Sequence, residues 1–452
     1  MGMRFMNIAL NRWLLIALSL FGVASFLSIA GANVFLGLST LFFLIILAKN
    51  KGYKVSEDKV VYYKAIGVFA LAMLVSALCS GNIGYGLKTW ADFFVWRFMP
   101  FIIIVSLFDE KLKAEKLLKA VLCGFCIDSL YAIYQGAIVY KFNIAHGRAD
   151  GFVGHPMTIA GWECILLPVL LVFIFRKDIS KKMQWVYAVL FAIFSVALIF
   201  NSTRGAWLAL AIALPLISLP FILKSSKAFI AFASVVVLIG TALVSSPSFM
   251  KRVDSITDTR NWSNASRFII WDTAYGMFKE HPVLGVGLGQ FKPQFQSKFE
   301  DSKELQQQAV EYRKYQNNKK QKKLTAAQKK LTKEQVNVLA GANRKLWENK
   351  QLRGLTHAHN NFMQMLGENG IVGLLGYIIA FGFILWKNLK NYFVNKNPYA
   401  LMIVGSTTAL LLQGLTEYNF GNSSVMKIYW FVLACLIVLA SAYNKAKLEV
   451  KN

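Results

Sequence analysis

Three separate segments combine side chains that bind phosphate with one that can move a proton. Arg204 and Arg267 carry guanidinium groups, whose planar fork suits phosphate better than the ammonium of lysine does. His359 carries an imidazole, which titrates near neutral pH and can take a proton from a hydroxyl group. These residue types together predict a site that holds a phosphate and activates a hydroxyl.

Each of these residues has a plainer explanation when it is considered alone. Arg204 could extend to lipid headgroups at the edge of a membrane. Arg267 and Trp271 are four residues apart, share a helix face and could form a cation–π pair. A single histidine beside a membrane span, such as His359, usually only caps the end of a helix. Only the combination favours chemistry.

His357 and His359 could also suggest a metal ligand pair. No nearby cysteine or third histidine completes a ligand set, so we expect no metal. His357 is expected either to support its neighbour or to face water. Asn360 or His357 could cap the helix that follows.

The sequence lacks the common motifs that bind a catalytic metal ion or a nucleotide. We find no DxD pair on the predicted outer face and no GxxxxGK[ST] phosphate loop. Gly285-Val-Gly287-Leu-Gly289 matches part of a dinucleotide fingerprint, but no strand precedes it, and we interpret it as a turn between two helices. We therefore expect no cofactor.

The composition is that of a membrane protein. Of 452 residues, 56% are hydrophobic and 16% are charged, and the mean hydropathy is +0.45. Soluble domains are about 45–50% apolar and about 25% charged. The net charge of +27 would suggest a nucleic-acid partner for a soluble protein, but in a membrane protein it indicates basic cytoplasmic loops. We expect no nucleic acid as a partner.

About twelve windows are long and apolar enough to span a bilayer, which predicts an all-α polytopic membrane protein. Short loops alternate between lysine-rich and lysine-poor, so the positive-inside rule places both termini in the cytoplasm. The windows lie near 13–30, 33–48, 60–78, 91–108, 120–140, 158–175, 183–200, 205–223, 228–245, 366–386, 399–416 and 425–443.

The long segment 246–365 divides the chain between the ninth and tenth spans. We expect 1–245 to hold nine spans, 246–365 to form a large helical periplasmic loop, and 366–452 to hold three spans and a cytoplasmic tail. Within the loop, 302–350 is rich in lysine and glutamine. It predicts a solvated helical hairpin, or a basic surface for anionic headgroups or glycans.

Other polar residues lie in or beside the predicted spans. Arg148 and His155, between the fifth and sixth spans, are candidate substrate contacts or ordinary loop residues. Asp128 lies near the middle of a span, where an unpaired charge is costly, and Arg97 is a candidate partner. Glu163 could line the same cavity.

The sequence resembles the O-antigen ligase family. The resemblance lies in Arg204-Gly-Ala-Trp207 after a mid-chain span, in the Arg267 segment of the large loop, and in a histidine motif before a late span. That motif reads His359-Asn360, nine residues, then Gly370. The order and the twelve-span frame also match.

The resemblance implies an inverting, metal-independent glycosyltransferase of the bacterial inner membrane. Its donor would be a glycan on undecaprenyl diphosphate, and its acceptor a sugar hydroxyl of lipid A-core at the periplasmic face, among membrane lipids. Arg204 and Arg267 would bind the diphosphate, and His359 would activate the acceptor. His357, Asn360, Glu368, Arg148, His155 and Trp271 would support them, and Glu368 could orient His359.

Other functions fit the same residues. A polymerase of the family, or a ligase that glycosylates protein hydroxyls, differs from an O-antigen ligase only in its acceptor. A secondary transporter of a small anion would require ionisable residues near the bilayer midplane and broken helices in two related halves. Asp128 favours that transporter, whereas the arginines at the outer edge favour the enzyme.

Overall fold

The computed structural model describes residues 2–50, 55–144, 147–223, 245–258 and 262–449, and no strand occurs in these ranges. The protein is therefore all-α in the described part, as predicted. Its main helices are α1 (Gly2–Leu27), α2 (Ile29–Asn50), α3 (Glu57–Leu78), α4 (Ile83–Ala91), α5 (Met99–Leu107), α6 (Lys111–Tyr134), α7 (Pro156–Phe175), α8 (Lys181–Asn201), α9 (Arg204–Ile222), α11 (Pro247–Asp254), α12 (Trp262–Glu280), α13 (Phe291–Ser297), α14 (Lys303–Lys320), α15 (Ala326–Lys329), α16 (Lys333–Arg353), α17 (Asn361–Asn395), α18 (Pro398–Gln413) and α19 (Ser423–Glu449).

Eleven of the predicted spans coincide with helical segments. Ten of these segments are long and apolar enough to cross a bilayer, and α18 is a shorter apolar helix. Two of the ten include a π-helical stretch: η1 (Asp92–Trp96) joins α4 to α5, and η2 (Gln135–Val139) extends α6. The predicted span 228–245 lies almost wholly outside the described residues, so the total of twelve remains a prediction.

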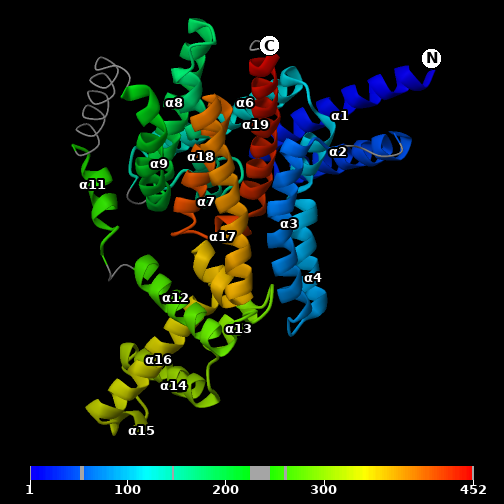
Figure 1. Cartoon of the computed structure of the whole chain (residues 1–452). Helices are drawn as coiled ribbons and strands as arrows, with labels where there is room; N and C mark the ends of the chain where they lie inside the picture. The colour runs from blue at the N-terminus through cyan, green and yellow to red at the C-terminus, as the bar shows by residue number, and fades with distance from the viewer. Residues whose placement is uncertain (1, 51–54, 145–146, 224–244, 259–261, 450–452) are drawn as a thin grey trace.

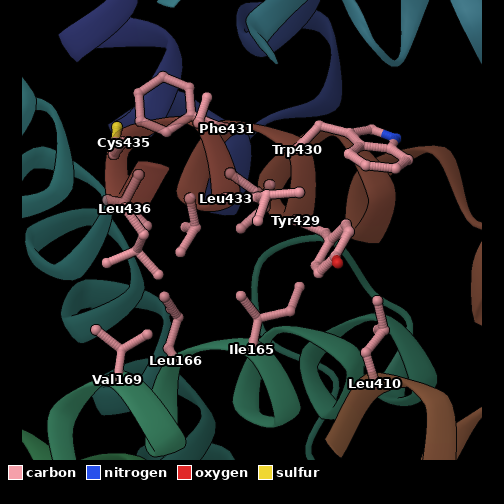
Figure 2. Close-up of a cluster of buried hydrophobic side chains, with 14 of the residues drawn as sticks. Ile165, Leu166, Val169, Leu410, Tyr429, Trp430, Phe431, Leu433, Cys435 and Leu436 are labelled. Carbon is pink, nitrogen blue, oxygen red and sulfur yellow. The ribbon is translucent and has the colours of Figure 1, made fainter. Parts of the chain in front are cut away.

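Helices α7 and α19 form the centre of the bundle. An apolar 18-residue window of each is 89% buried, whereas the corresponding windows of the other candidate spans are half buried or less. Figure 2 shows Ile165 and Leu166 of α7 facing Leu433 and Leu436 of α19. A helix that is apolar on every face is expected at such a position. Because lipid is as apolar as these side chains, close van der Waals packing holds the helices together here.

A break in α17 anchors the segment that connects α12 to α13. Gly370 has φ +62°, and a Cβ there would lie 2.4 Å from the carbonyl oxygen of Val283. The backbone amides of Ile371 and Val372 donate to the carbonyls of Pro282 and Val283, at 3.0 and 3.2 Å. The glycine-rich stretch is therefore a turn docked on a kinked helix, as predicted, and it is not part of a dinucleotide-binding strand.

The lysine-rich insert forms the predicted helical hairpin. Helices α14 and α16 pack against each other and remain largely exposed, and Figure 1 shows them at the end of the molecule opposite the C-terminus. Arg353 forms an ion pair with Asp301 at 2.7 Å, which closes the base of the hairpin. The rings of Trp262 and Trp347 are 5.8 Å apart and connect α16 to α12.

Asp128 does not pair with Arg97, its candidate partner, but it does have a hydrogen-bond partner inside the protein. Arg97 instead pairs with Asp92 and donates to the carbonyls of Phe420 and Gly421. Asp128 is fully buried and accepts a hydrogen bond of 2.9 Å from a backbone amide of the α6–α7 loop. The sequence shows Asp92 five residues before Arg97, but it could not show that the two side chains pair.

Candidate functional site

The turn between α8 and α9 fixes the position of Arg204. Ser202 adopts a left-handed conformation with φ +57°, which ends α8 and lets α9 begin two residues later. Asn201 is buried, and its amide donates to the carbonyls of Ala149 and Pro156 at 3.3 and 2.6 Å. The turn is thereby tied to the loop before α7, and Arg204 begins the next helix at a defined place.

Two more arginines attach to this turn from other parts of the chain. Arg148 donates to the hydroxyl of Thr203 at 2.8 Å and to the carbonyl of Asn201 at 3.2 Å. Arg252 of α11 donates to the carbonyl of Ser202 at 3.1 Å. Each uses part of its donor set on neutral acceptors, which do not neutralise its positive charge.

Arg204 connects the turn to the start of α12. Its guanidinium donates to the carbonyl of Ser255 and to the side-chain oxygen of Asn264, the latter at 2.9 Å. Arg267 lies three residues after Asn264 on the same helix, and residues three apart share a helix face. Arg204 and Arg267 are therefore brought to one side of α12.

Arg148, Arg204, Arg252 and Arg267 line a single pocket with a volume of about 40 Å³, which we call the arginine pocket. Its other lining residues are Met157, Thr203, Gly205, Ser263, Gln413, Thr416 and Glu417. Among the described residues, none of the four guanidiniums lies within 4.0 Å of a carboxylate. Such a concentration of unpaired positive charge is suited to an anion with several oxygen atoms.

The charges in the arginine pocket act on one another. Burial, followed by the charge of Arg252, lowers the pKa of Arg148 to about 10. Burial likewise lowers the pKa of Arg252 and of Arg267, and the nearby carboxylate of Glu417 partly offsets the effect on Arg267. A guanidinium with a pKa of about 10 is still charged at neutral pH, so the pocket keeps its positive charge.

The histidine motif is held at the start of α17. Asn360 caps the helix, because its side-chain oxygen accepts from the amides of Phe362 and Met363 at 2.8 and 3.1 Å. The indole N–H of Trp271 donates to the carbonyl of Ala358 at 2.9 Å. His359 has φ +48°, a conformation that costs energy for a residue with a side chain and that persists only where its surroundings enforce it.

His359 and Glu417 form a hydrogen-bonded pair. Nδ1 of His359 lies 3.2 and 3.3 Å from the two carboxylate oxygens of Glu417. Burial opposes ionisation of Glu417, but the hydrogen bond and charge of His359 outweigh it and hold the pKa of the carboxyl below its ordinary value. The carboxylate is therefore ionised at neutral pH and can accept a proton from Nδ1 of His359, and in that tautomer Nε2 is the basic nitrogen.

Gly205 brings Glu417 close to the arginines. A Cβ on Gly205 would lie 2.0 Å from the hydroxyl oxygen of Thr416, so a larger residue there would force the Thr416 side chain of the α18–α19 loop to move. Glu417 lines the arginine pocket and also contacts His359. The cationic pocket and the imidazole thus meet at one carboxylate.

Comparison with known proteins relates this geometry to a family. Residues 188–318 match the family model described as O-antigen ligase. This segment is therefore similar to the O-antigen ligase family. Members of the family are glycosyltransferases, and their substrates are lipid-linked glycans. The matched segment contains Arg204, Arg252 and Arg267, and it ends before His359 and Glu417.

A relative of the chain shows a more limited similarity. The chain is 25% identical over 210 residues to a protein of Haemophilus influenzae that is described as uncharacterized. The similar region covers 42% of this chain and 50% of that protein, so the chain spans about half the length of the curated relative it matches.

Several of the site residues predicted from the sequence lie together in the structure. Arg204, Arg267 and Arg148 line the arginine pocket, and His359 adjoins it through Glu417. Nδ1 of His357 accepts the backbone N–H of His359 at 3.3 Å. Burial, followed by the charge of His359, lowers the pKa of His357 to about 4, so this side chain is neutral at neutral pH.

Two of the predicted site residues, His155 and Glu368, have other contacts. His155 is exposed, and its Nδ1 lies 3.1 Å from the hydroxyl of Thr158. Glu368 does not orient His359: its carboxylate accepts from the amides of Gly289 and Phe291 at 2.9 and 3.2 Å. Glu368 therefore holds the glycine-rich turn against α17. It does not contact His359, which lies nine residues before it in the sequence.

Sequence reasoning missed Arg252 and Glu417. Arg252 lies in the long loop among many basic residues, and no spacing singled it out. Glu417 lies between the last two predicted spans, in a loop with no other charged residue, and that was a usable signal.

Three side chains at this site could also act as metal ligands. His357, His359 and Glu417 each offer one ligand atom, and these atoms lie within 4.8 Å of one another. Glu417 thus supplies the third group that the sequence did not reveal. Two nitrogens and a carboxylate are a set that zinc accepts. Four guanidiniums beside Glu417 oppose a divalent cation, so the electrostatics favour an anion here.

Proposed function

We propose that the protein is an O-antigen ligase, which transfers a glycan from undecaprenyl diphosphate to a sugar hydroxyl of lipid A-core at the periplasmic face. The observation that carries this proposal is a pocket lined by four guanidiniums and by Glu417, whose carboxylate also contacts His359. A lipid-linked diphosphate glycan supplies the anion, and the acceptor sugar supplies the hydroxyl.

At the donor, the site must neutralise the negative charge of the diphosphate. Arg204, Arg252 and Arg267 bind the diphosphate oxygens, and Arg148 holds the turn that carries Arg204. As the bond between the anomeric carbon and the phosphate oxygen breaks, the diphosphate leaves with the electron pair. Preorganised cations stabilise the charge that develops on it, so no metal is required.

The acceptor end requires a base. Nε2 of His359 takes the proton of the acceptor hydroxyl while its oxygen attacks the anomeric carbon on the side opposite the leaving diphosphate. Glu417 holds the Nδ1 proton and stabilises the imidazolium that forms. Direct displacement inverts the configuration of the anomeric carbon. The proton then passes from His359 to solvent, and the imidazole is ready for another cycle.

The test is transfer by the purified protein, with undecaprenyl-diphosphate glycan as donor and lipid A-core as acceptor. We expect His359→Ala, Arg204→Ala and Arg267→Ala each to reduce transfer by roughly a hundredfold or more. Arg344→Ala is the matched control. It removes the same charge, but Arg344 is exposed on the hairpin. Full activity in His359→Ala would refute the proposed mechanism.

The acceptor distinguishes this function from that of a polymerase or of a ligase acting on protein. We expect a deletion strain to lose every glycan-capped lipopolysaccharide band. Bands capped with a single repeat unit would indicate a polymerase, and unchanged lipopolysaccharide with an unmodified target protein would indicate a ligase for protein hydroxyls. Unchanged glycans together with loss of anion uptake in proteoliposomes would indicate a transporter.

The proposal also places the protein in the bacterial inner membrane with both termini cytoplasmic. The apolar helices fit a multi-pass membrane protein, and the alternating basic loops support this orientation. A tag inserted at the tip of the α14–α16 hairpin should be degraded by protease added to intact spheroplasts. A protected tag would reverse the orientation.

A further inference from the structure

A second, larger cavity lies far from the arginine pocket. It is a groove of about 460 Å³ between the start of α3 and the last turns of α17 and α19. Along α17 alone, Lys387 in the groove is 17 residues beyond the break at Gly370, which corresponds to roughly 25 Å of helix. Figure 1 shows these ends of α3, α17 and α19 at the same end of the bundle as the C-terminus.

The walls of this groove are apolar. They include Val61 of α3, Phe383, Trp386 and Val394 of α17, and Ile437 of α19. Trp386 is 58% exposed and Val394 is 66% exposed, so no protein segment among the described residues covers them. Exposed apolar surface at the end of spanning helices is suited to the hydrocarbon part of a lipid.

Two lysines lie on the same groove and extend over aromatic rings. Nζ of Lys387 is 5.2 Å from the ring centre of Tyr62, and Nζ of Lys390 is 5.6 Å from that of Trp386. Among the described residues, neither ammonium lies within 4.0 Å of a carboxylate. The one acidic residue of the lining, Asp58, attracts Lys387 but forms no ion pair with it.

Neutral polar groups complete the lining. Asn391 accepts hydrogen bonds from the amide groups of Asn395 and Asn444, at 2.9 and 3.1 Å, and Ser441 lies beside them. These groups form a polar floor next to the lysines. The groove therefore combines cationic, hydrogen-bonding and apolar groups, which match the phosphate, hydroxyl and hydrocarbon parts of an anionic amphiphile.

We propose that this groove binds an anionic phospholipid. Its phosphate lies between Lys387 and Lys390, its glycerol and headgroup hydroxyls meet the asparagines, and an acyl chain follows Phe383, Trp386 and Val394. A lysine near a membrane surface contributes about 1 kcal/mol toward anionic lipid, which is about a fivefold preference for each residue. This inference depends on the groove and its charges, and it stands whether or not the arginine pocket binds a diphosphate.

Native mass spectrometry of the full chain can test the proposal. The protein is exchanged into detergent containing equal amounts of phosphatidylglycerol and phosphatidylcholine, and the bound lipid is identified. We expect retained phosphatidylglycerol in the unmodified protein and a roughly 20-fold lower preference in Lys387→Ala/Lys390→Ala. Inorganic phosphate alone should not compete, because it lacks the acyl chain that the apolar wall holds.

Two further variants separate the groove from general surface charge. Lys181→Ala/Lys182→Ala removes two exposed lysines at the start of α8 and should leave lipid preference unchanged. Val394→Trp fills the apolar wall without changing charge and should also displace the lipid, with folding verified by gel filtration. Equal retention of the two lipids by the unmodified protein, or undiminished preference in both groove variants, would overturn the proposal. Competition by inorganic phosphate would do the same.

Discussion

Glu417 follows His359 by 58 residues, yet its carboxylate lies 3.2 Å from Nδ1 of that histidine. The pair is assembled by two loops, one before α17 and one between α18 and α19. Trp271 and Asn360 fix the first loop, and Gly205 allows the second to approach. The relationship fixes which nitrogen of His359 is basic, and the predictions below begin with it.

Glu417→Gln should reduce transfer while leaving the fold intact. The amide has a similar shape but no charge, so it neither selects the Nδ1–H form of His359 nor stabilises the imidazolium. We expect turnover to fall by roughly 10²- to 10⁴-fold with little change in the donor KM. Steady-state kinetics would measure this split. Unchanged turnover would show that His359 acts without its carboxylate.

Arg252→Ala should weaken donor binding. A charge-assisted hydrogen bond contributes about 1.5–3 kcal/mol, so the apparent affinity for the lipid-linked donor should fall by roughly 10- to 100-fold. Arg252→Lys should recover only part of this loss, because its ammonium lacks the planar fork. Titration of the donor would report the change, with Arg344→Ala as the charge-matched control. Wild-type donor affinity would remove Arg252 from the anion site.

Gly370→Ala should destabilise the protein. The residue adopts φ +62°, and the added methyl group would meet backbone atoms of Val283, so a cost of about 1–3 kcal/mol or more is expected. Gly382→Ala is the matched control on the same helix, because a Cβ there has open space around it. Thermal unfolding should show a lower Tm for the first variant alone. Equal Tm values would mean that the kink tolerates a side chain.

Stability should fall with acidification partly because of His357. Its pKa is about 4 in the folded protein and 6.5 in an unfolded chain, so between these values the unfolded chain binds a proton that the folded protein does not. Stability is therefore highest above pH 6.5 and is lost as pH falls toward 4, by up to about 3 kcal/mol. His357→Gln should show a smaller drop in Tm between about pH 7 and about pH 5. A drop equal to that of the unmodified protein would contradict this assignment.

Chelation should leave transfer unchanged. The positive charge of the arginine pocket opposes a divalent cation at His357, His359 and Glu417, although their ligand atoms lie close together. Activity after extensive dialysis against EDTA, compared with mock-dialysed protein, is the measurement. Loss of activity that zinc or manganese restores would show that these three residues hold a metal.

The sequence predicted the helical frame well, because a run of about 20 apolar residues directly indicates a helix that can span a membrane. It also singled out Arg204, Arg267 and His359, since each departs from the apolar pattern around it, and the fold brings Arg204 and Arg267 to one pocket and His359 to a carboxylate that lines it. It did not predict the partners. Arg97 was a candidate partner for Asp128 and Glu368 a candidate for orienting His359, whereas the fold pairs Arg97 with Asp92 and His359 with Glu417. Glu417 meets His359 because two loops come together in space, and spacing along a chain does not contain that information.

The arginine pocket collects its guanidiniums from four stretches: the loop before α7, the start of α9, α11 and α12. Like charges gathered in this way push those stretches apart, and a bound polyanion would tie them together as a cross-link does. A bound anion would therefore also hold these four stretches of the chain together. Its departure would loosen them, and in the proposed reaction that would open the site for the next glycan donor.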